Sequence, residues 1–394
     1  MLTYKQAQQL ITQQARSFGK ETIPLDQCVG RVLAETIIAD RDYPPFNRAT
    51  MDGYAFAFAD FQQGMRKFPV LEIIYAGQSA TQKNTGGACY KIMTGAPVPA
   101  DANVVIRRED TREADGRVEL LIDTCQPFQN ISRRGEDVKQ HTPVIDRPVI
   151  CNAAVTSLLA AVGKDTVMVE RLPTVAVLTT GNEVVPVSSM VSAAQIRNSN
   201  AALLKALLAK QLITPVSVEH VADDKDLLRK TLAKALEADI IITCGAVSAG
   251  DADFIPLIAG ELGIKTLFHK LSIKPGKPVL CGVTSKGGML FGLPGNPFSC
   301  LVTFILFIQH YLNACYQLNT GEPVQIKLQG ERSKKNMLDE FFPAKWIKSS
   351  NSIEPITFNG SGDIQAALYA DGIALHPSPK ERIETGDTIS CWPL

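Results

Sequence analysis

From residue 174 onward, wholly apolar runs alternate with amphipathic stretches. The runs TVAVLTT (174–180) and DIIITCG (239–245) have the pattern of strands buried on both faces. The stretches AALLKALLAKQ (201–211) and DKDLLRKTLAKALEA (224–238) repeat apolar positions at helical spacing. Strand and helix in alternation predict an α/β domain with a parallel-rich sheet and right-handed crossovers.

The flanking regions have a different pattern. Residues 68–138, and the chain from about residue 320 onward, hold short β-rich runs separated by Gly, Pro and Asn turns. They predict two small β domains, the second barrel-like. The first 17 residues predict an amphipathic helix from about Thr3 to Ser17.

Charge and composition exclude some classes of function. The 394 residues carry 40 basic and 40 acidic side chains, for a formal net charge of zero, and 45% are hydrophobic. Proteins that coat nucleic acid or bind membrane surfaces show a basic excess. We therefore expect no nucleic-acid or membrane partner, and any anion site must come from a local cluster.

Cysteine usage and apolar runs bear on the compartment. The nine cysteines are scattered without a CxxC pair, and the five histidines form no HxxxH motif. This argues against a zinc site and favours buried free thiols in a reducing compartment. The most apolar run, Phe298 to Ile308, is shorter than the roughly 20 residues that span a bilayer. We expect a buried core helix and a cytoplasmic protein.

Three glycine-bearing loops follow strands of the predicted sheet. They are TTGNE (179–183), CGAVSAGDADF (244–254) and GLPGNPFS (292–299). Ligands of open α/β sheets bind beyond the carboxyl ends of the strands. Asn296 and Pro297 also open a predicted helix, whose first backbone N–H groups stabilise anions. One such turn is usually an ordinary connection, but three at one sheet edge indicate a site.

Lysines near these loops indicate an anionic ligand. The segment HKLSIKPGKP holds Lys270, Lys274 and Lys277, with two prolines and a glycine that stiffen the turn. Lysines held this close suit phosphate or another oxyanion. A solvated hairpin is the alternative, and it would not need the stiffening.

Acidic residues at the same edge indicate a divalent cation. Glu183, Asp224, Asp251 and Asp253 all fall at loop positions. Carboxylates repel phosphate unless a hard cation lies between them, and Mg²⁺ binds one or two carboxylates together with phosphate oxygens. Some of the four could be helix caps, and Asp224, which opens its helix, is the first candidate.

Two motifs lie outside the α/β region. MDGYA (51–55) places Asp52 before a glycine, and SRRGEDV (132–138) combines two arginines with two carboxylates. Taken alone, the first is an ordinary Asx-turn and the second a surface charge cluster. Both become candidates for the site if a second copy of the chain brings them there.

Seven ordered motifs carry a resemblance to a known family. They are PFNRATMDGYAF, IMTGAPVPADANVVIRRED, NISRRGED, VLTTGNE, GAVSAGDADF, KLSIKPGKP and GLPGNPFS. Together they resemble the molybdopterin molybdenumtransferases, the family of bacterial MoeA proteins and the E domain of gephyrin. The resemblance covers essentially the whole chain.

The resemblance implies four domains and a homodimer. The first domain would join residues 1–40 and 139–170 around an inserted β domain of residues 41–138. The α/β molybdopterin-binding domain would span 171–318, and the C-terminal β domain 319–394. The active cleft would lie between the α/β domain of one subunit and the MDGYA and RRGED loops of the other.

The resemblance also implies the reaction. Molybdate and Mg²⁺ would act on adenylylated molybdopterin, supplied by an upstream molybdopterin adenylyltransferase, and AMP would leave. Catalytic roles would fall to Asp52, Asp137, Glu183, Lys270 and Lys274. Substrate would be bound by Thr94, Arg133, Arg134, Ser248, Lys277, Pro294, Gly295, Asn296 and Pro297. Glu183, Asp224 and Asp253 would hold the metal.

Three positions depart from the family pattern. Ala246 and Ala194 stand where glycines are usual, and Asn182 replaces an aspartate. They bear on substrate affinity more than on catalysis. Cys244 has no nearby histidine partner in sequence, and we interpret it as a packing residue. A non-catalytic pterin-binding or scaffold protein of the gephyrin type stays open as the alternative. The two β domains and the RRGED loop argue against a third reading, a nucleotide hydrolase.

Overall fold

The computed structural model describes residues 1–247, 254–318 and 321–394. The chain divides into two compact units. The large unit comprises residues 1–34, 148–152 and 167–394, and the small unit comprises residues 35–147 and 153–166. Each unit is described by itself below.

A six-stranded sheet forms the centre of the large unit, in the order β18-β15-β19-β23-β22-β20. The first four strands run parallel, and β22 and β20 are antiparallel to their neighbours. Their bounds are β15 Val175–Thr180, β18 Ser217–Val221, β19 Ile240–Cys244, β20 Lys265–His269, β22 Leu280–Val283 and β23 Met289–Leu293. The predicted parallel-rich α/β domain is confirmed.

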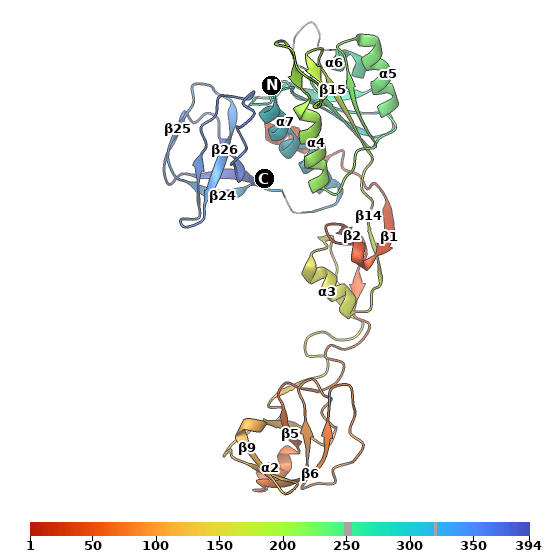
Figure 1. Cartoon of the computed structure of the whole chain (residues 1–394), viewed down its shortest axis with the longest axis vertical. Helices are drawn as coiled ribbons and strands as arrows, with labels where there is room; N and C mark the ends of the chain where they lie inside the picture. Colours follow the sequence, from red (N-terminus) through yellow and green to blue (C-terminus); the bar gives the residue numbers. More distant parts are fainter. Residues whose placement is uncertain (248–253, 319–320) are drawn as a thin grey trace. The chain divides into compact units, whose positions relative to one another are not determined.

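Helices cover both faces of this sheet (Figure 1). Alternate residues of β15 point to opposite faces, with Val177 in one core and Leu178 in the other. The first core includes helix α4 (Ser199–Lys210), and the second includes α5 (Lys225–Ala235) and α6 (Ile255–Glu261). Because both faces are covered, every residue of β15 and β19 is buried.

The long apolar helix after the sheet is part of the first core. It runs through α7 (Pro297–Thr303), a π-helical segment (Phe304–Gln309) and α8 (His310–Cys315). At 19 residues it is long and apolar enough to cross a membrane, and so longer than the sequence predicted, but 83% of its most apolar window is buried inside the protein. Burial rather than length therefore identifies it as the predicted core helix.

The C-terminal region of the large unit is a closed five-stranded barrel. The pairings run β26-β27-β24-β30-β28 and return to β26. Closure removes exposed sheet edges. The strands are β24 Val324–Leu328, β26 Asp339–Ile347, β27 Ser352–Pro355, β28 Gly372–His376 and β30 Thr388–Pro393. All five coincide with β runs predicted from the sequence.

A short strand joins the barrel to the α/β domain. β21 (Ile273–Lys274) follows β20 and pairs in parallel with the start of β26, so that Lys274 lies opposite Glu340. Helix α1 (Tyr4–Thr12) packs between the two, with Tyr4 against Phe341 and Trp392. The barrel and the sheet edge are thereby fixed to each other.

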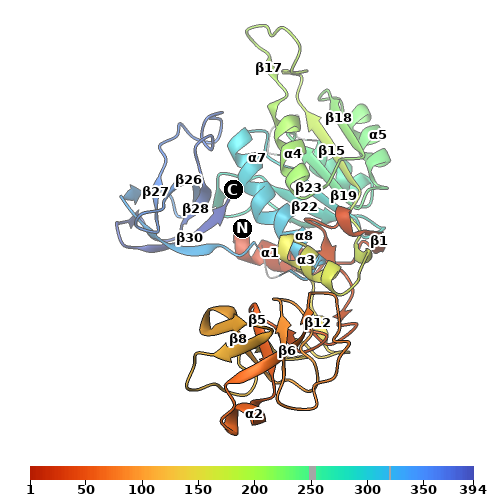
Figure 2. The same cartoon turned by 60° about the horizontal axis from the view of Figure 1, so that its bottom comes forward.

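The small unit contains the inserted β domain, shown in Figure 2. Its six-stranded sheet has the order β8-β5-β7-β6-β10-β9. Phe56 and Phe68 stack in its core with ring centroids 5.0 Å apart. The strands are β5 Gly53–Phe56, β6 Lys67–Ile74, β7 Cys89–Ile92, β8 Val104–Arg107, β9 Thr111–Ala114 and β10 Arg117–Leu120.

Some local predictions differ from the structure. Helix α1 ends at Thr12 rather than near Ser17, and Thr3 caps it in a reciprocal pair with Gln6. Helix α6 was not predicted, because Pro256 and Gly260 interrupt its pattern. The nine cysteines are buried thiols, as predicted.

A buried histidine in the barrel makes stability depend on pH. His376 is fully buried; its Nε2 donates to the carbonyl of Lys380 at 2.8 Å, and its Nδ1 lies 3.4 Å from Arg332. Burial and the charge of Lys334 lower the pKa of His376 to about 4. Between pH 6.5 and 4 the unfolded chain therefore binds a proton that the folded barrel does not.

We expect His376→Gln to flatten the loss of stability between pH 6.5 and 4. The wild-type barrel should lose up to about 3 kcal/mol of unfolding free energy from this histidine over that range. Trp346 and Trp392, the only two tryptophans, both lie in barrel strands, so urea unfolding followed by their fluorescence measures it. The exposed His141, changed to Asn, is the control, and equal pH dependence in His376→Gln and wild type would refute the assignment.

Candidate functional site

A cavity of about 830 Å³ opens at the carboxyl ends of the parallel strands. It is lined by the loops after β15, β19 and β23, as the positions of the three glycine-bearing loops predicted. Of the predicted residues it is lined by Glu183, Pro294, Gly295, Asn296 and Pro297. We call it the strand-end cavity.

The TGNE loop is fastened to the loop after β18. The backbone N–H of Asn182 donates to Asp223 Oδ2 at 3.2 Å, and the N–H of Asp223 donates to Asn182 Oδ1 at 3.1 Å. Asp223 and Glu183 both line the strand-end cavity. The departure at Asn182 therefore takes part in a reciprocal pair that positions two carboxylates.

Asp224 occupies a different position from its neighbour. It is the N-cap of α5, and its Oδ1 accepts the N–H of Leu227 at 2.8 Å. Asp224 is not among the residues that line the strand-end cavity, whereas Asp223 is. In the structure Asp224 is therefore a helix cap, which was the alternative considered for it. The carboxylate that lines the cavity belongs to the preceding residue, Asp223.

Asparagines position the GLPGNP loop. Asn200 Nδ2 donates to the carbonyl of Gly295 at 2.6 Å, and Asn296 Nδ2 donates to Ser361 Oγ at 2.9 Å. Asn296 is the N-cap of α7 but makes no side-chain capping bond. The Oδ1 of Asn200 is buried without a partner in the described chain. At the start of α7, Pro297 has no N–H and the N–H of Phe298 donates to the carbonyl of Ser361 at 3.3 Å, so neither is a free donor for an anion.

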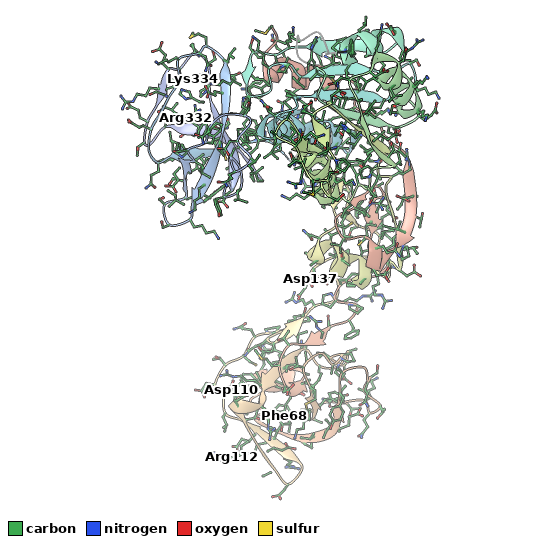
Figure 3. All side chains as sticks on the ribbon, turned by 45° about the horizontal axis from the view of Figure 1, so that its top comes forward. Phe68, Asp110, Arg112, Asp137, Arg332 and Lys334 are labelled. Carbon is green, nitrogen blue, oxygen red and sulfur yellow. The ribbon has the colours of Figure 1, made fainter. Side chains whose placement is uncertain are left out.

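A second cavity of about 470 Å³ adjoins the first, and we call it the lysine cavity. Lys274 and Lys277 line it from the α/β domain, and Arg332 and Glu340 line it from the barrel. Figure 3 labels Arg332 on the barrel. The two cavities share the lining residues Pro278, Pro294 and Asn296.

Backbone geometry shapes the walls of both cavities. Gly276, in the turn between the lysines, has φ +101°, and a Cβ there would lie 2.6 Å from Thr303. Ala246 has φ +52° in the loop after β19. An L-residue in this left-handed region costs about 1–2 kcal/mol, so the alanine found at a usual glycine position strains the loop.

Other predicted residues lie elsewhere. Lys270 is half-buried and is not among the lining residues of either cavity. Ser248, Asp251 and Asp253 lie outside the described residues. Within the described part of the chain, no three His, Cys, Asp or Glu side chains converge as a metal site.

The structure brings two predicted residues of the small unit together. Asp52 Oδ1 accepts the backbone N–H and the hydroxyl of Thr94, each at 2.7 Å. These hydrogen bonds, backbone first, lower the pKa of Asp52. Asp52 is therefore a fixed, ionised carboxylate at neutral pH.

The RRGED loop is held by neighbouring residues of the small unit. Arg134 Nε donates to Asp42 at 2.6 Å, and the guanidinium of Arg133 lies 4.0 Å from the ring centre of Phe128. The N–H of Asp137 donates to the carbonyl of Tyr43. The side chains of Arg134 and Asp42 form an ion pair, so Arg134 is already partly neutralised.

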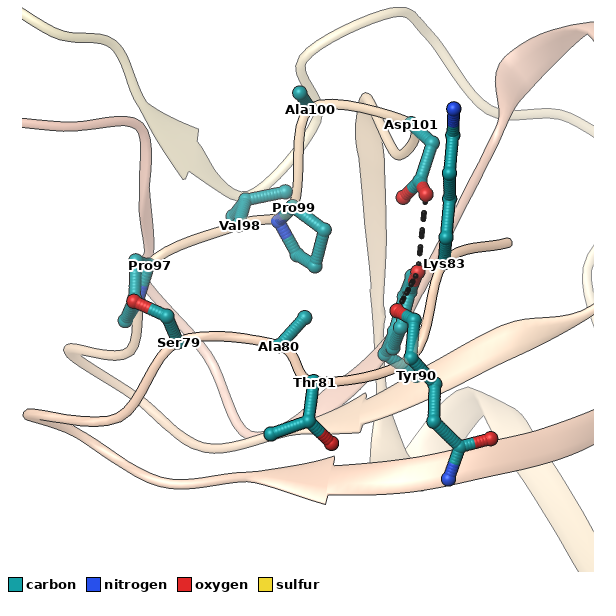
Figure 4. A pocket seen from close by; sticks show the side chains of 11 residues that line it. Ser79, Ala80, Thr81, Lys83, Tyr90, Pro97, Val98, Pro99, Ala100 and Asp101 are labelled. Carbon is teal, nitrogen blue, oxygen red and sulfur yellow. Dashed lines mark hydrogen bonds between the residues drawn. The ribbon is translucent and has the colours of Figure 1, made fainter. Parts of the chain in front are cut away.

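The small unit has a further cavity of about 620 Å³, between the segments at residues 79–83 and 97–101 (Figure 4). Tyr90 lines it, and its hydroxyl oxygen lies 3.0 Å from Asp101 Oδ2 and 2.9 Å from the carbonyl oxygen of Gln82. None of the predicted site residues lines it. It does not contribute to the candidate site.

Three lining residues escaped the sequence analysis. Asp223 is adjacent to a residue that looks like a helix cap, so spacing alone could not separate the two. Arg332 lies 55 residues beyond Lys277 and reaches the cavity from the C-terminal β domain, where its side chain pairs with Glu340. Asn200 directly precedes the predicted helix of residues 201–211 and carried no further signal.

Comparisons with known proteins agree over the whole chain. A family model described as the MoeA N-terminal region (domain I and II) matches residues 2–163, and one described as a probable molybdopterin binding domain matches residues 176–314. A protein of Synechocystis sp., named molybdopterin molybdenumtransferase, is 30% identical over 402 residues, covering 100% of this chain and 99% of that protein. A protein of the same name from Staphylococcus epidermidis is 31% identical over 401 residues, covering 98% and 94%. The crystal structure of the molybdopterin biosynthesis moeA protein from Pyrococcus horikoshii matches with a TM-score of 0.87 at 28% identity, covering 100% of both chains.

We expect the adjacent aspartates to respond differently to substitution. Asp224→Ala should lower the unfolding free energy by about 1 kcal/mol, because it removes the cap of α5. Asp223→Ala should leave α5 intact but release the TGNE loop, which amide hydrogen exchange at Asn182 and Glu183 would report as faster exchange. Fast exchange in Asp224→Ala and slow exchange in Asp223→Ala would contradict this division of roles.

Proposed function

The chain belongs to the family of molybdopterin molybdenumtransferases, enzymes of molybdenum cofactor biosynthesis, and we propose that it inserts molybdate into adenylylated molybdopterin with Mg²⁺ and releases AMP. One observation carries the proposal. A cavity lined by carboxylates adjoins a cavity with three cationic side chains, and the two share a wall. A phosphorylated pterin and an oxyanion can therefore bind side by side.

The strand-end cavity suits the pterin nucleotide. Its volume of about 830 Å³ lies within the usual range for small-molecule and cofactor sites. The unpartnered Oδ1 of Asn200 would accept an N–H group, which both the pterin and the adenine rings carry. The N-terminal end of α7, which lines this cavity with Asn296 and Pro297, would favour the negative charge of the phosphate through the helix dipole.

The carboxylates of this cavity fit magnesium. Mg²⁺ takes one or two protein carboxylates and completes its coordination with water and phosphate oxygens. Glu183 and Asp223 line this cavity and supply that number of carboxylates. We propose them as the first ligands of the ion. Asp253 and Asp224 remain further candidates. The bound ion would neutralise phosphate charge as the phosphoanhydride is cleaved. Through its hydrogen bonds with Asn182, Asp223 would hold the TGNE loop, and Glu183 within it, in place beside that ion.

The lysine cavity suits molybdate. Lys274, Lys277 and Arg332 present ammonium and guanidinium donors to one volume, and Glu340 is the acidic residue among its lining side chains. Three positive charges and one negative charge leave about two positive charges for a dianion. Lys274 and Lys277 would hold its oxygens, and Pro278 and Pro294 would keep the shared wall rigid. Catalysis is then mainly positioning and charge neutralisation.

We further propose that the small unit of a second subunit completes the site. Asp52 and Thr94 are hydrogen-bonded to each other, and Arg133, Arg134 and Asp137 lie together in the RRGED loop. Their roles in binding substrate require a homodimer that places them over the large unit of the partner. An upstream adenylyltransferase would supply the substrate, and the nine free cysteines favour a cytoplasmic setting.

The central test is release of AMP from adenylylated molybdopterin by the purified protein with Mg²⁺ and molybdate. Lys274→Ala should lower the molybdate-dependent rate by at least about 100-fold, since it removes one of the cations around the oxyanion. Lys286→Ala is the matched control, because Lys286 is exposed and pairs with Glu237 instead.

Two results would count against the proposal. Wild-type protein that releases no AMP under these conditions is not the proposed enzyme. Equal molybdate-dependent rates of AMP release in Lys274→Ala and Lys286→Ala would show that the lysine cavity takes no part in the reaction.

The shared site can be tested by mixing subunits. Asp52→Ala and Lys274→Ala should each be inactive alone, and heterodimers of the two should contain one intact cleft and one doubly damaged cleft. Random exchange of subunits in a twofold dimer should restore about a quarter of wild-type activity. Co-expression with two affinity tags would isolate the heterodimer.

Absence of any recovery in the isolated heterodimer would place both residues in a cleft of one chain. A monomeric protein in solution, measured by light scattering, would exclude the shared cleft directly.

A further inference from the structure

The lysine cavity contains a buried carboxylate. Glu340 is 5% exposed and is the second residue of the long barrel strand β26, directly opposite Lys274 across the parallel pairing. It lines a cavity whose other charged side chains are cationic. A carboxylate at this point opposes the binding of any anion, so its presence needs a reason.

Three side chains hold Glu340. Arg332 Nη2 donates to Oε1 at 2.7 Å, and Asn336 Nδ2 donates to Oε2 at 2.8 Å. Lys274 Nζ lies 3.5 Å from the same Oε1. Burial alone would raise the pKa of Glu340, but the hydrogen bonds from Arg332 and Asn336 and the nearby positive charges outweigh it and lower the pKa. Glu340 is therefore ionised at neutral pH.

The two cations on Oε1 differ in how firmly they are bound. Arg332 has a short contact and a side chain only 17% exposed. Lys274 has a long contact and a side chain 57% exposed. An exposed ion pair at this distance contributes little and is readily exchanged. Lys274 can leave Glu340 for an incoming anion, while Arg332 stays in place.

We infer that Glu340 is an internal counter-ion of the lysine cavity, which pairs with Lys274 when no oxyanion is bound and limits the affinity for oxyanions. The inference rests on the proposed function, since it concerns the oxyanion of that reaction. Glu340 would change the affinity for the oxyanion through its charge, and it would not donate a hydrogen bond to the anion. If Glu340 instead had a purely structural role and only neutralised Arg332 in the barrel, its charge would not change the affinity for oxyanions.

The charge of the anion separates these two roles. Removal of one negative charge favours bound anions by a Coulomb energy proportional to the anion charge. A tetrahedral dianion must therefore gain twice as much, on a logarithmic scale, as a tetrahedral monoanion of the same shape. Tungstate and perrhenate form such a pair, and molybdate is the physiological dianion of the proposal.

The experiment is calorimetric titration of the full chain with molybdate, tungstate and perrhenate. Glu340→Gln keeps the shape and the hydrogen-bonding oxygen but removes the charge. We expect it to bind tungstate and molybdate about tenfold more tightly and perrhenate about threefold more tightly than wild type. Glu331→Gln is the control, because it removes the same charge from an exposed barrel residue that pairs with Arg382. It should leave all three affinities unchanged.

Unchanged or weaker tungstate binding by Glu340→Gln, with native tryptophan fluorescence, would overturn the inference. An equal gain for tungstate and perrhenate would overturn it too, because that points to shape rather than charge. If Glu340→Gln does not fold, the same comparison is made between Arg332→Gln and the double variant Arg332→Gln/Glu340→Gln. The double variant must then bind tungstate more tightly than Arg332→Gln.

These outcomes are distinct from failure of the proposed function. Wild-type protein that binds none of the three anions would show that the lysine cavity is not an oxyanion site, and both proposals would fail together. Wild-type protein could instead bind molybdate and release AMP while the Glu340→Gln variant has an unchanged affinity. In that case only the counter-ion inference would fail.

Discussion

The parallel pairing of β21 with β26 is the contact on which the lysine cavity depends. It joins a two-residue strand at the edge of the α/β domain to the longest strand of the barrel, and it sets Lys274 opposite Glu340. Without this register the cations of the α/β domain and Arg332 of the barrel would not face one volume. The contact of Tyr4 with Phe341 and Trp392 reinforces the same junction, since edge-to-face aromatic pairs add to the burial of their surfaces.

Most of the fold could be predicted because its strands carry strong local patterns. β15 and β19 are continuous apolar runs, and the structure buries every one of their residues between two helical layers. The five barrel strands are likewise visible as separate runs. The end of α1 and the existence of α6 were harder. Helix ends depend on a few capping groups, and the proline and glycine in α6 weaken its intrinsic propensity while tertiary packing still holds it.

The candidate site was predictable where topology alone decides it. Carboxyl ends of parallel strands share one edge, so three glycine-bearing loops had to meet there, and they line the strand-end cavity. Single-residue choices were not predictable in this way. Asp223 and Asp224 have the same chemistry and adjacent positions, and only the backbone conformation at the start of α5 makes one a cap and the other a cavity residue. Arg332 could not be found from spacing, because it reaches the lysine cavity from the C-terminal β domain.

Under the proposed function, opposite charges in adjoining cavities would let one protein bind two anions and a cation together. A phosphate group and an oxyanion repel each other, and the repulsion grows as water is excluded. Carboxylates on one side would retain a cation beside the phosphate, and Lys274, Lys277 and Arg332 would neutralise the oxyanion on the other. Pro278 and Pro294 form part of the common wall, so the two charged regions stay close without merging. As the counter-ion that we infer, Glu340 would complete this balance, because its fixed negative charge would keep the cations from binding the oxyanion too tightly for its metal to be transferred.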